Sequence, residues 1–128
     1  MQKTIIQPPT LPDPTPRAYS HGVRVGNLLF VAGQTGVDRE RRVEAGNFEA
    51  QTRRAFANIQ AVLEAAGGTL DNLVTMTVFI TDMRYGDEFV RLRREILGRD
   101  FPASALIGVS HLANPDALVE IQAIAVLD

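Results

Sequence analysis

The spacing of apolar residues changes along the chain between a helical period of about 3.6 and a strand period of about two. In residues 48–66, apolar positions recur at steps of three and four, and Gly67-Gly68 follows, since glycine adopts the left-handed conformation at low cost. A second pattern of this kind covers residues 85–97 and ends at Gly98. The sequence therefore predicts two amphipathic helices.

Strand patterns occupy most of the remaining chain. Residues 19–25 and 28–32 flank the turn Gly26-Asn27, which is typical of an antiparallel hairpin because both residues tolerate a positive φ. The second of these strands is expected to end at Gly33-Gln34. Three further strands are predicted over residues 73–81, 103–109 and 118–127.

The predicted order is hairpin, helix, strand, helix, strand, strand. This order indicates an α+β fold with two helices on one face of the sheet. A chain of 128 residues is the size of one domain, so we expect a single domain over residues 1–128. Residues 1–16 are rich in proline and are predicted to form an extended lead-in. The second sheet face is left open, and oligomerisation would cover it if it is apolar.

Composition narrows the available chemistry. The absence of cysteine excludes disulfides, thiol nucleophiles, zinc fingers and iron–sulfur clusters. A formal net charge of −2 gives no basic footprint for nucleic acid, so we expect no nucleic-acid partner. No apolar run approaches the roughly 20 residues of a membrane span, and no signal-peptide pattern is present, so we expect a cytoplasmic protein without membrane contact.

Glu120 is the most informative carboxylate. It lies inside the last predicted strand, where alternation places it on one face with Gln122, Leu118, Ile124 and Val126. Apolar neighbours desolvate a carboxylate and favour its protonated form, and such a group can position or activate a water molecule. Spacing alone favours a carboxylate that faces solvent on an edge strand.

Other candidate groups have simpler interpretations. The pairs Ser20-His21 and Ser110-His111 suggest a nucleophile with its base, but neighbouring strand residues point to opposite faces. We therefore expect neither pair to hydrogen-bond internally and interpret both as surface or loop residues. We interpret the arginines in residues 39–42 as part of a solvated loop. The arginines in residues 91–94 are interpreted as lying on the solvent-exposed face of the second helix.

A family resemblance rests on several segments that extend over nearly the whole chain from about Tyr19. They are residues 19–22, 25–34, 51–53, 58–59, 63–67, 78–83, 101–103 and 119–125. With these segments the sequence resembles the Rid (YjgF) family of reactive-intermediate, or enamine and imine, deaminases.

The resemblance implies a chorismate-mutase-like α+β subunit with a mixed sheet, assembled as a homotrimer with sheets inside and helices outside. Three clefts would lie between neighbouring subunits and hold a small-molecule substrate. Family deaminases hydrolyse enamines and imines to a 2-keto acid and ammonia, and they need no cofactor or metal. A non-catalytic small-molecule-binding or chaperone-like trimer is the alternative, and a weak endoribonuclease, which this composition does not support, is the third.

The resemblance also assigns roles to individual residues. Glu120 matches the glutamate that positions the attacking water, and Tyr19 matches a tyrosine near the cleft. Gly33 matches a glycine whose backbone lies at the cleft, and Ala32 stands where a serine is usual.

Two substrate-binding positions depart from the family pattern. Ser104 stands where family deaminases have an arginine that binds the substrate carboxylate, and Val90 stands where some members have an asparagine. A serine offers one neutral donor in place of a charged fork. The resemblance is therefore to the subfamilies that lack this arginine, and deamination of 2-imino acids is not implied.

Overall fold

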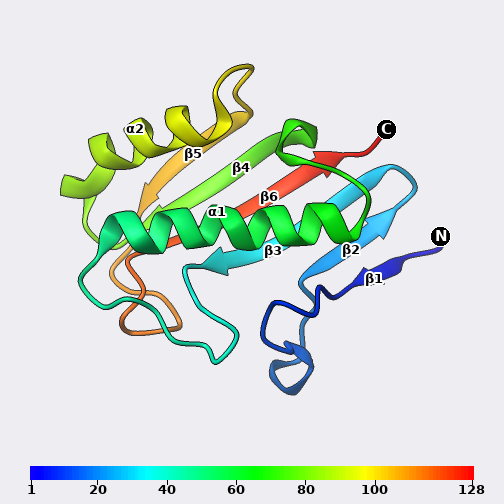
Figure 1. Ribbon diagram of the computed structural model, residues 1–128, viewed down its shortest axis with the longest axis horizontal. Coiled ribbons are helices and arrows are strands. Elements are labelled where there is room, and N and C mark those ends of the chain that lie inside the picture. The colour runs from blue at the N-terminus through cyan, green and yellow to red at the C-terminus, as the bar shows by residue number, and fades with distance from the viewer.

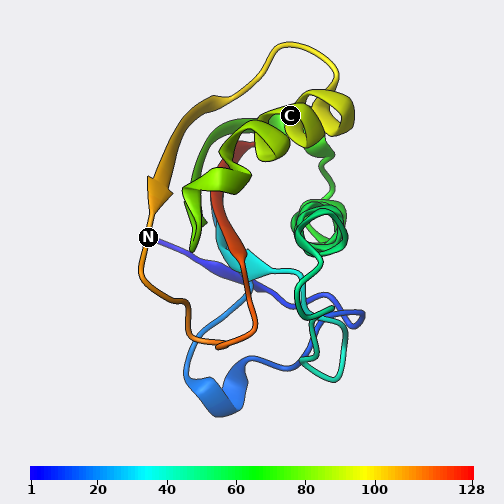
Figure 2. The same ribbon diagram turned by 90° about the vertical axis from the view of Figure 1, so that its left-hand side faces the viewer.

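The computed structural model describes residues 1–128 as a six-stranded mixed sheet with two α-helices on one face (Figures 1 and 2). The strand order is β1-β2-β3-β6-β4-β5, and only the pair β4–β5 is parallel. This arrangement confirms the predicted two-helix α+β fold. The elements are β1 (Thr4–Ile6), β2 (Gly22–Val25), β3 (Leu28–Thr35), α1 (Phe48–Ala65), β4 (Leu73–Ile80), α2 (Gly86–Leu97), β5 (Ala103–Gly108) and β6 (Val119–Val126).

Both helices form where the apolar spacing predicts them. The side chain of Asn47 accepts a hydrogen bond from the Ala50 amide at 3.0 Å and caps the start of α1. Gly67, with φ +87°, lies just beyond its end. Phe56 from α1 and Phe89 from α2 stack with ring centroids 6.0 Å apart in the core. The structure contains no helix that combines the length and apolar character needed to cross a membrane.

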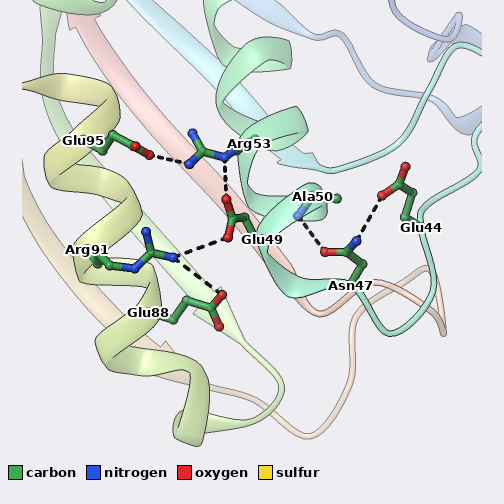
Figure 3. A network of polar contacts seen from close by, with 8 residues as sticks. All are labelled: Glu44, Asn47, Glu49, Ala50, Arg53, Glu88, Arg91 and Glu95. Carbon is green, nitrogen blue, oxygen red and sulfur yellow. Dashed lines mark hydrogen bonds and ion pairs between the residues drawn. The ribbon is translucent and has the colours of Figure 1, made fainter.

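A network of ion pairs connects the outer surfaces of α1 and α2 (Figure 3). Arg53 bonds both Glu49 on its own helix and Glu95 on α2. Arg91 lies 3.4 Å from Glu49 and 3.9 Å from Glu88. These side chains are solvated, so each pair contributes little to the free energy of unfolding. The network orients the two helices and occupies Arg91.

The N-terminal segment differs from the predicted extended lead-in. Thr4–Ile6 precede the prolines, keep their amide donors and pair with β2 as an edge strand. Thr15–Arg17 form a 3₁₀ turn, and Ala18 takes a left-handed φ of 62°. The strand predicted from residue 19 therefore begins only at Gly22.

Strand β3 is longer than the sequence pattern predicts. The predicted end at Gly33-Gln34 is wrong, since the strand continues to Thr35. The pairing of β3 with β6 shifts register between Val31 and Gln34, which is a β-bulge that absorbs Ala32 and Gly33. The strand resumes after the bulge with the Gln34 side chain buried in the interior.

The two faces of the sheet have different environments. Alternate residues of β6, from Val119 to Ala125, are buried beneath the helices, while Ile124 and Val126 on the opposite face are only partly covered. Phe30 of β3 lies opposite Ile124 in the register and is 42% exposed. Neither helix covers this second face of the sheet (Figure 2), so its large apolar side chains stay partly exposed.

Gln51 connects α1 to the loops that lead into the helix and into β6. Its side-chain amide donates to the carbonyl oxygens of Glu44, at 2.9 Å, and Asp116, at 3.1 Å. Its side-chain oxygen accepts from the Leu118 amide at 2.8 Å. The side chain is buried with all its hydrogen-bonding groups occupied, and it fixes where β6 begins.

We predict that Gln51→Leu strongly destabilises the protein. The substitution removes three hydrogen bonds and leaves the Asp116 carbonyl and the Leu118 amide without a partner, while the Glu44 carbonyl keeps its bond from the Asn47 amide. Each unpaired group costs about 1–3 kcal/mol. Denaturant unfolding should show a loss of roughly 2–5 kcal/mol. Gln60→Leu is the matched control, because Gln60 lies exposed on the same helix and bonds only Glu64. Equal stabilities of the two variants would contradict the role of Gln51.

Candidate functional site

A cavity of about 530 Å³ lies where the bulge of β3 meets the start of β6 and the N-terminal turn. It brings together four of the residues that the sequence singled out, namely Glu120, Tyr19, Gly33 and Ala32. The remaining lining residues are Pro12, Arg17, His21, Gln34, Thr35, Val37, Arg41, Ala113, Asn114 and Pro115. Glu120, which is predicted to position water, therefore lines the same cavity of a single chain as the other three predicted residues.

Glu120 has no hydrogen-bond or ion-pair partner among the protein groups. It projects from the open face of β6, with Thr35 of β3 and Phe79 of β4 as its neighbours in the register. The side chain is partly buried, and this desolvation raises the pKa of the Glu120 carboxyl above its usual 4.5. The alternation correctly placed Glu120 on the face of β6 opposite the buried Val119 and Ile121, and the edge-strand position is wrong, because β6 pairs on both sides.

Gly33 determines where this carboxylate can lie. A Cβ atom placed on Gly33 would be only 2.2 Å from Oε2 of Glu120 and 2.9 Å from its Cδ. The carboxylate therefore rests against the backbone of the bulge in space that any other residue at position 33 would occupy. The bulge and the carboxylate form one structural unit.

His21 lies in the loop before β2, as predicted, but it is buried and not at the surface, and it forms part of the framework behind the cavity. Its Nε2–H donates to the Pro12 carbonyl at 2.7 Å, and its Nδ1 accepts from the Gln34 amide at 3.1 Å. That amide also donates to the Ala32 carbonyl, which fixes its orientation. The Tyr19 ring meets the His21 ring edge-on, with centroids 5.7 Å apart. His21 thus connects the N-terminal turn to the bulge and orients Tyr19.

Two arginines line the same cavity. Arg41, with φ 66°, turns back toward the N-terminal segment and donates from Nη2 to the Asp13 carbonyl. Arg17, on the 3₁₀ turn, is exposed. Residues 39–42 form a loop as predicted, in which Arg41 is partly buried and Arg42 pairs with Asp38 and Glu40 at the surface. Neither Arg17 nor Arg41 forms an ion pair with Glu120.

Ser104 and Val90 do not line this cavity. They line a separate hollow of about 290 Å³ between α2 and the edge strand β5. Ser104 contacts α2 on the helix-covered side of the sheet, whereas Glu120 projects from the opposite side. One chain therefore does not bring the two predicted groups together.

Arg93 is a candidate binding residue that the sequence analysis missed. Its Nη1 donates to Oγ of Ser104 at 2.7 Å, and its guanidinium carbon lies 5.1 Å from the centroid of the Phe89 ring. Burial lowers the pKa of the Arg93 guanidinium. The interpretation of residues 91–94 as a wet helix face is thus wrong for Arg93. Its contact with Ser104 joins residues on different elements, so helical spacing alone gave no signal for it.

The second Ser–His pair also differs from expectation. Oγ of Ser110 and Nδ1 of His111 lie 3.3 Å apart, so the expectation that they cannot hydrogen-bond internally is wrong. Both residues lie in the loop after β5, where the alternation of a strand does not apply. Both are exposed and outside the Glu120 cavity. No three carboxylate or histidine side chains are grouped closely enough to hold a metal ion.

Comparison with known proteins identifies the family. The family described as Endoribonuclease L-PSP matches residues 11–127. A RutC family protein of Pyrococcus abyssi is 36% identical over 98% of both chains. This protein belongs to the Rid/YjgF family.

Relatives within the Rid/YjgF family include a protein with a named activity. A 2-iminobutanoate/2-iminopropanoate deaminase of Dermatophagoides farinae is 32% identical over 98% of both chains. The crystal structure of RidA from an Antarctic Psychrobacter has a TM-score of 0.90 and 33% identity, covering 97% of this chain and 99% of that one. The mixed sheet with two helices is therefore the fold of this Rid family.

The raised pKa of Glu120 predicts a pH-dependent stability difference between the wild type and Glu120→Gln. Between the ordinary and the raised pKa, the folded wild type binds more protons than the unfolded chain, so its stability falls as pH rises through that window. Glutamine does not titrate. Thermal unfolding should show the variant gaining stability relative to the wild type from about pH 4 upward, with a constant difference above the window.

Glu64→Gln is the control for this measurement. Glu64 lies exposed on α1, and its substitution removes the same charge without changing a buried carboxylate. A difference between wild type and Glu120→Gln that does not vary with pH would show that the Glu120 carboxyl is fully solvated.

Proposed function

We propose that this Rid-family protein hydrolyses an imine, an enamine or a related C–N bond in a small molecule, with Glu120 positioning the attacking water. The observation that carries the proposal is a desolvated carboxylate without a protein partner, held against a bulge in a cavity of substrate size. The similarity to a named 2-imino acid deaminase supports the same class of chemistry.

The proposed reaction needs one general base, which accepts a proton from the attacking water molecule. Water adds to the carbon of the C=N bond, its oxygen forms the new C–O bond, and Glu120 accepts a proton from it. This proton is returned to the nitrogen, which gives a carbinolamine. Glu120 then takes the proton of the carbinolamine hydroxyl and passes it to the nitrogen, the C–N bond breaks, and a carbonyl compound and ammonia leave. A raised pKa brings the Glu120 carboxyl closer to neutrality and makes it better suited to take up and release this proton. The Tyr19 hydroxyl would hold the substrate in the same cavity.

We further propose that the complete site lies in a cleft between subunits of a homotrimer. Glu120 and Ser104 lie on opposite sides of one sheet and line different hollows, so a shared site needs two chains. The apolar open face that carries Phe30 and Ile124 gives the subunits a surface to bury against one another. In this arrangement Ser104 and Val90 of one subunit complete the Glu120 cavity of the next.

We predict that Glu120→Gln abolishes turnover without disturbing assembly. Glutamine preserves the shape of the side chain but cannot accept the proton, and loss of a general base costs about 10²–10⁴-fold in rate. The measurement is the rate of pyruvate and ammonia formation from 2-iminopropanoate, together with imines that lack a carboxylate. Light scattering on both proteins verifies the assembly.

The control is again Glu64→Gln, which should retain the wild-type rate. Unchanged turnover in Glu120→Gln would contradict the proposed mechanism. Selective retention of a small molecule without turnover by the wild type would replace hydrolysis with a non-catalytic binding function.

A further inference from the structure

The hollow between α2 and β5 is basic and contains no acidic side chain. Its lining consists of Val90, Arg93, Arg94, Phe101, Pro102 and Ser104. Phe101 and Pro102 form an apolar wall beside the two guanidinium groups. A hollow with this lining favours a small organic anion over a neutral or cationic ligand.

The arginines of α2 differ in the groups with which their guanidinium groups already interact. Arg91 is paired with Glu49 and Glu88. Arg94 is exposed and lies over the Phe101 ring at 5.4 Å. Arg93 has no carboxylate within 4 Å, and its only hydrogen-bond partner is the Ser104 hydroxyl. It is thus the half-buried cation of this helix that lacks a counter-charge.

The geometry around Arg93 prepares it to bind an anion. Its stem and guanidinium rest on the buried Phe89 ring, which limits the orientations of the side chain. One N–H group is used on Oγ of Ser104, and the others remain unoccupied. Because Oγ of Ser104 accepts from Arg93, its own proton is free to donate. The two side chains together offer a charged and a neutral donor to one oxyanion.

We propose that Arg93, supported by the hydroxyl of Ser104, binds the carboxylate of the substrate. The proposal rests on the function proposed above and specifies its substrate class as small carboxylate-bearing imines or enamines. A serine at position 104 therefore does not leave the binding position without a guanidinium, since α2 supplies one from a neighbouring element. Arg17 and Arg41, which line the Glu120 cavity, are the competing anion sites.

The test compares binding of pyruvate, a carboxylate product, with binding of its neutral amide, pyruvamide. The wild type should bind pyruvate about tenfold or more tightly than pyruvamide, because hydrogen bonds between charged groups contribute more than neutral ones. Binding is followed by chemical shifts of the full-length protein. In Arg93→Met this preference should disappear, while the aliphatic part of the side chain still packs on Phe89.

A second pair of variants keeps Arg93 in place. Ser104→Asp places a carboxylate beside the Arg93 guanidinium. This carboxylate should pair with the guanidinium and abolish the preference for pyruvate. Ser104→Asn is the neutral control of similar size and should retain most of the preference. Ser104 is exposed, so these substitutions do not alter the core. They keep the proposal testable if Arg93→Met fails to fold.

Two further controls separate the alternatives. Arg91→Met removes one charge from α2 outside the hollow and should leave the preference unchanged. Arg17→Met tests the competing site, and loss of the preference in this variant alone would overturn the assignment to Arg93. An undiminished preference in both Arg93→Met and Ser104→Asp would overturn it too, as would equal binding of both probes by the wild type.

Imine turnover is measured in the same preparations. If turnover is lost in Glu120→Gln but unchanged in Arg93→Met, the assignment of carboxylate binding to Arg93 is overturned. The proposed hydrolysis would then still stand. Loss of the preference for pyruvate in Arg93→Met and Ser104→Asp, with the controls unaffected, would support the assignment even for substrates other than 2-iminopropanoate.

Discussion

The close contact between Glu120 and the backbone of Gly33 is the constraint on which the rest of the site depends. The carboxylate occupies space that only a glycine leaves open, and the bulge at Ala32 and Gly33 presents that glycine to it. The bulge is held from behind by His21 and Gln34, which also connect it to the N-terminal turn. Desolvation of Glu120 and the shape of its cavity both follow from this packing, so fold stability and site geometry are coupled here.

The sheet separates the candidate site into two parts. Glu120 belongs to the open face, while Arg93 and Ser104 belong to the hollow beneath α2 at the sheet edge. The first part holds a carboxylate without a protein partner, and the second holds a cation without a counter-charge. A chain that keeps the two apart can unite them only through another copy of itself, and the uncovered apolar side chains of Phe30 and Ile124 provide a physical reason for such contact.

Local patterns in the sequence predicted the elements that local physics determines. The apolar stripe of α1 and the alternation around Glu120 placed the helix and the carboxylate correctly, because each depends on residues close in sequence. The bulge in β3, the burial of His21 and the contact of Arg93 with Ser104 were missed. Each of these depends on residues brought together by tertiary packing, which single-residue spacing does not encode.

Joint reassembly of Glu120→Gln and Arg93→Met subunits, each expected to lose turnover of carboxylate-bearing imines, tests whether the site is shared between subunits. Glu120→Gln and Arg93→Met are each assembled alone, then dissociated together and reassembled in equal amounts. In a closed ring whose sites draw on two neighbouring subunits, about a quarter of the sites combine an intact Glu120 with an intact Arg93. We expect recovery of about a quarter of the wild-type turnover on carboxylate-bearing imines. Mixed assemblies that remain as inactive as either variant would contradict it.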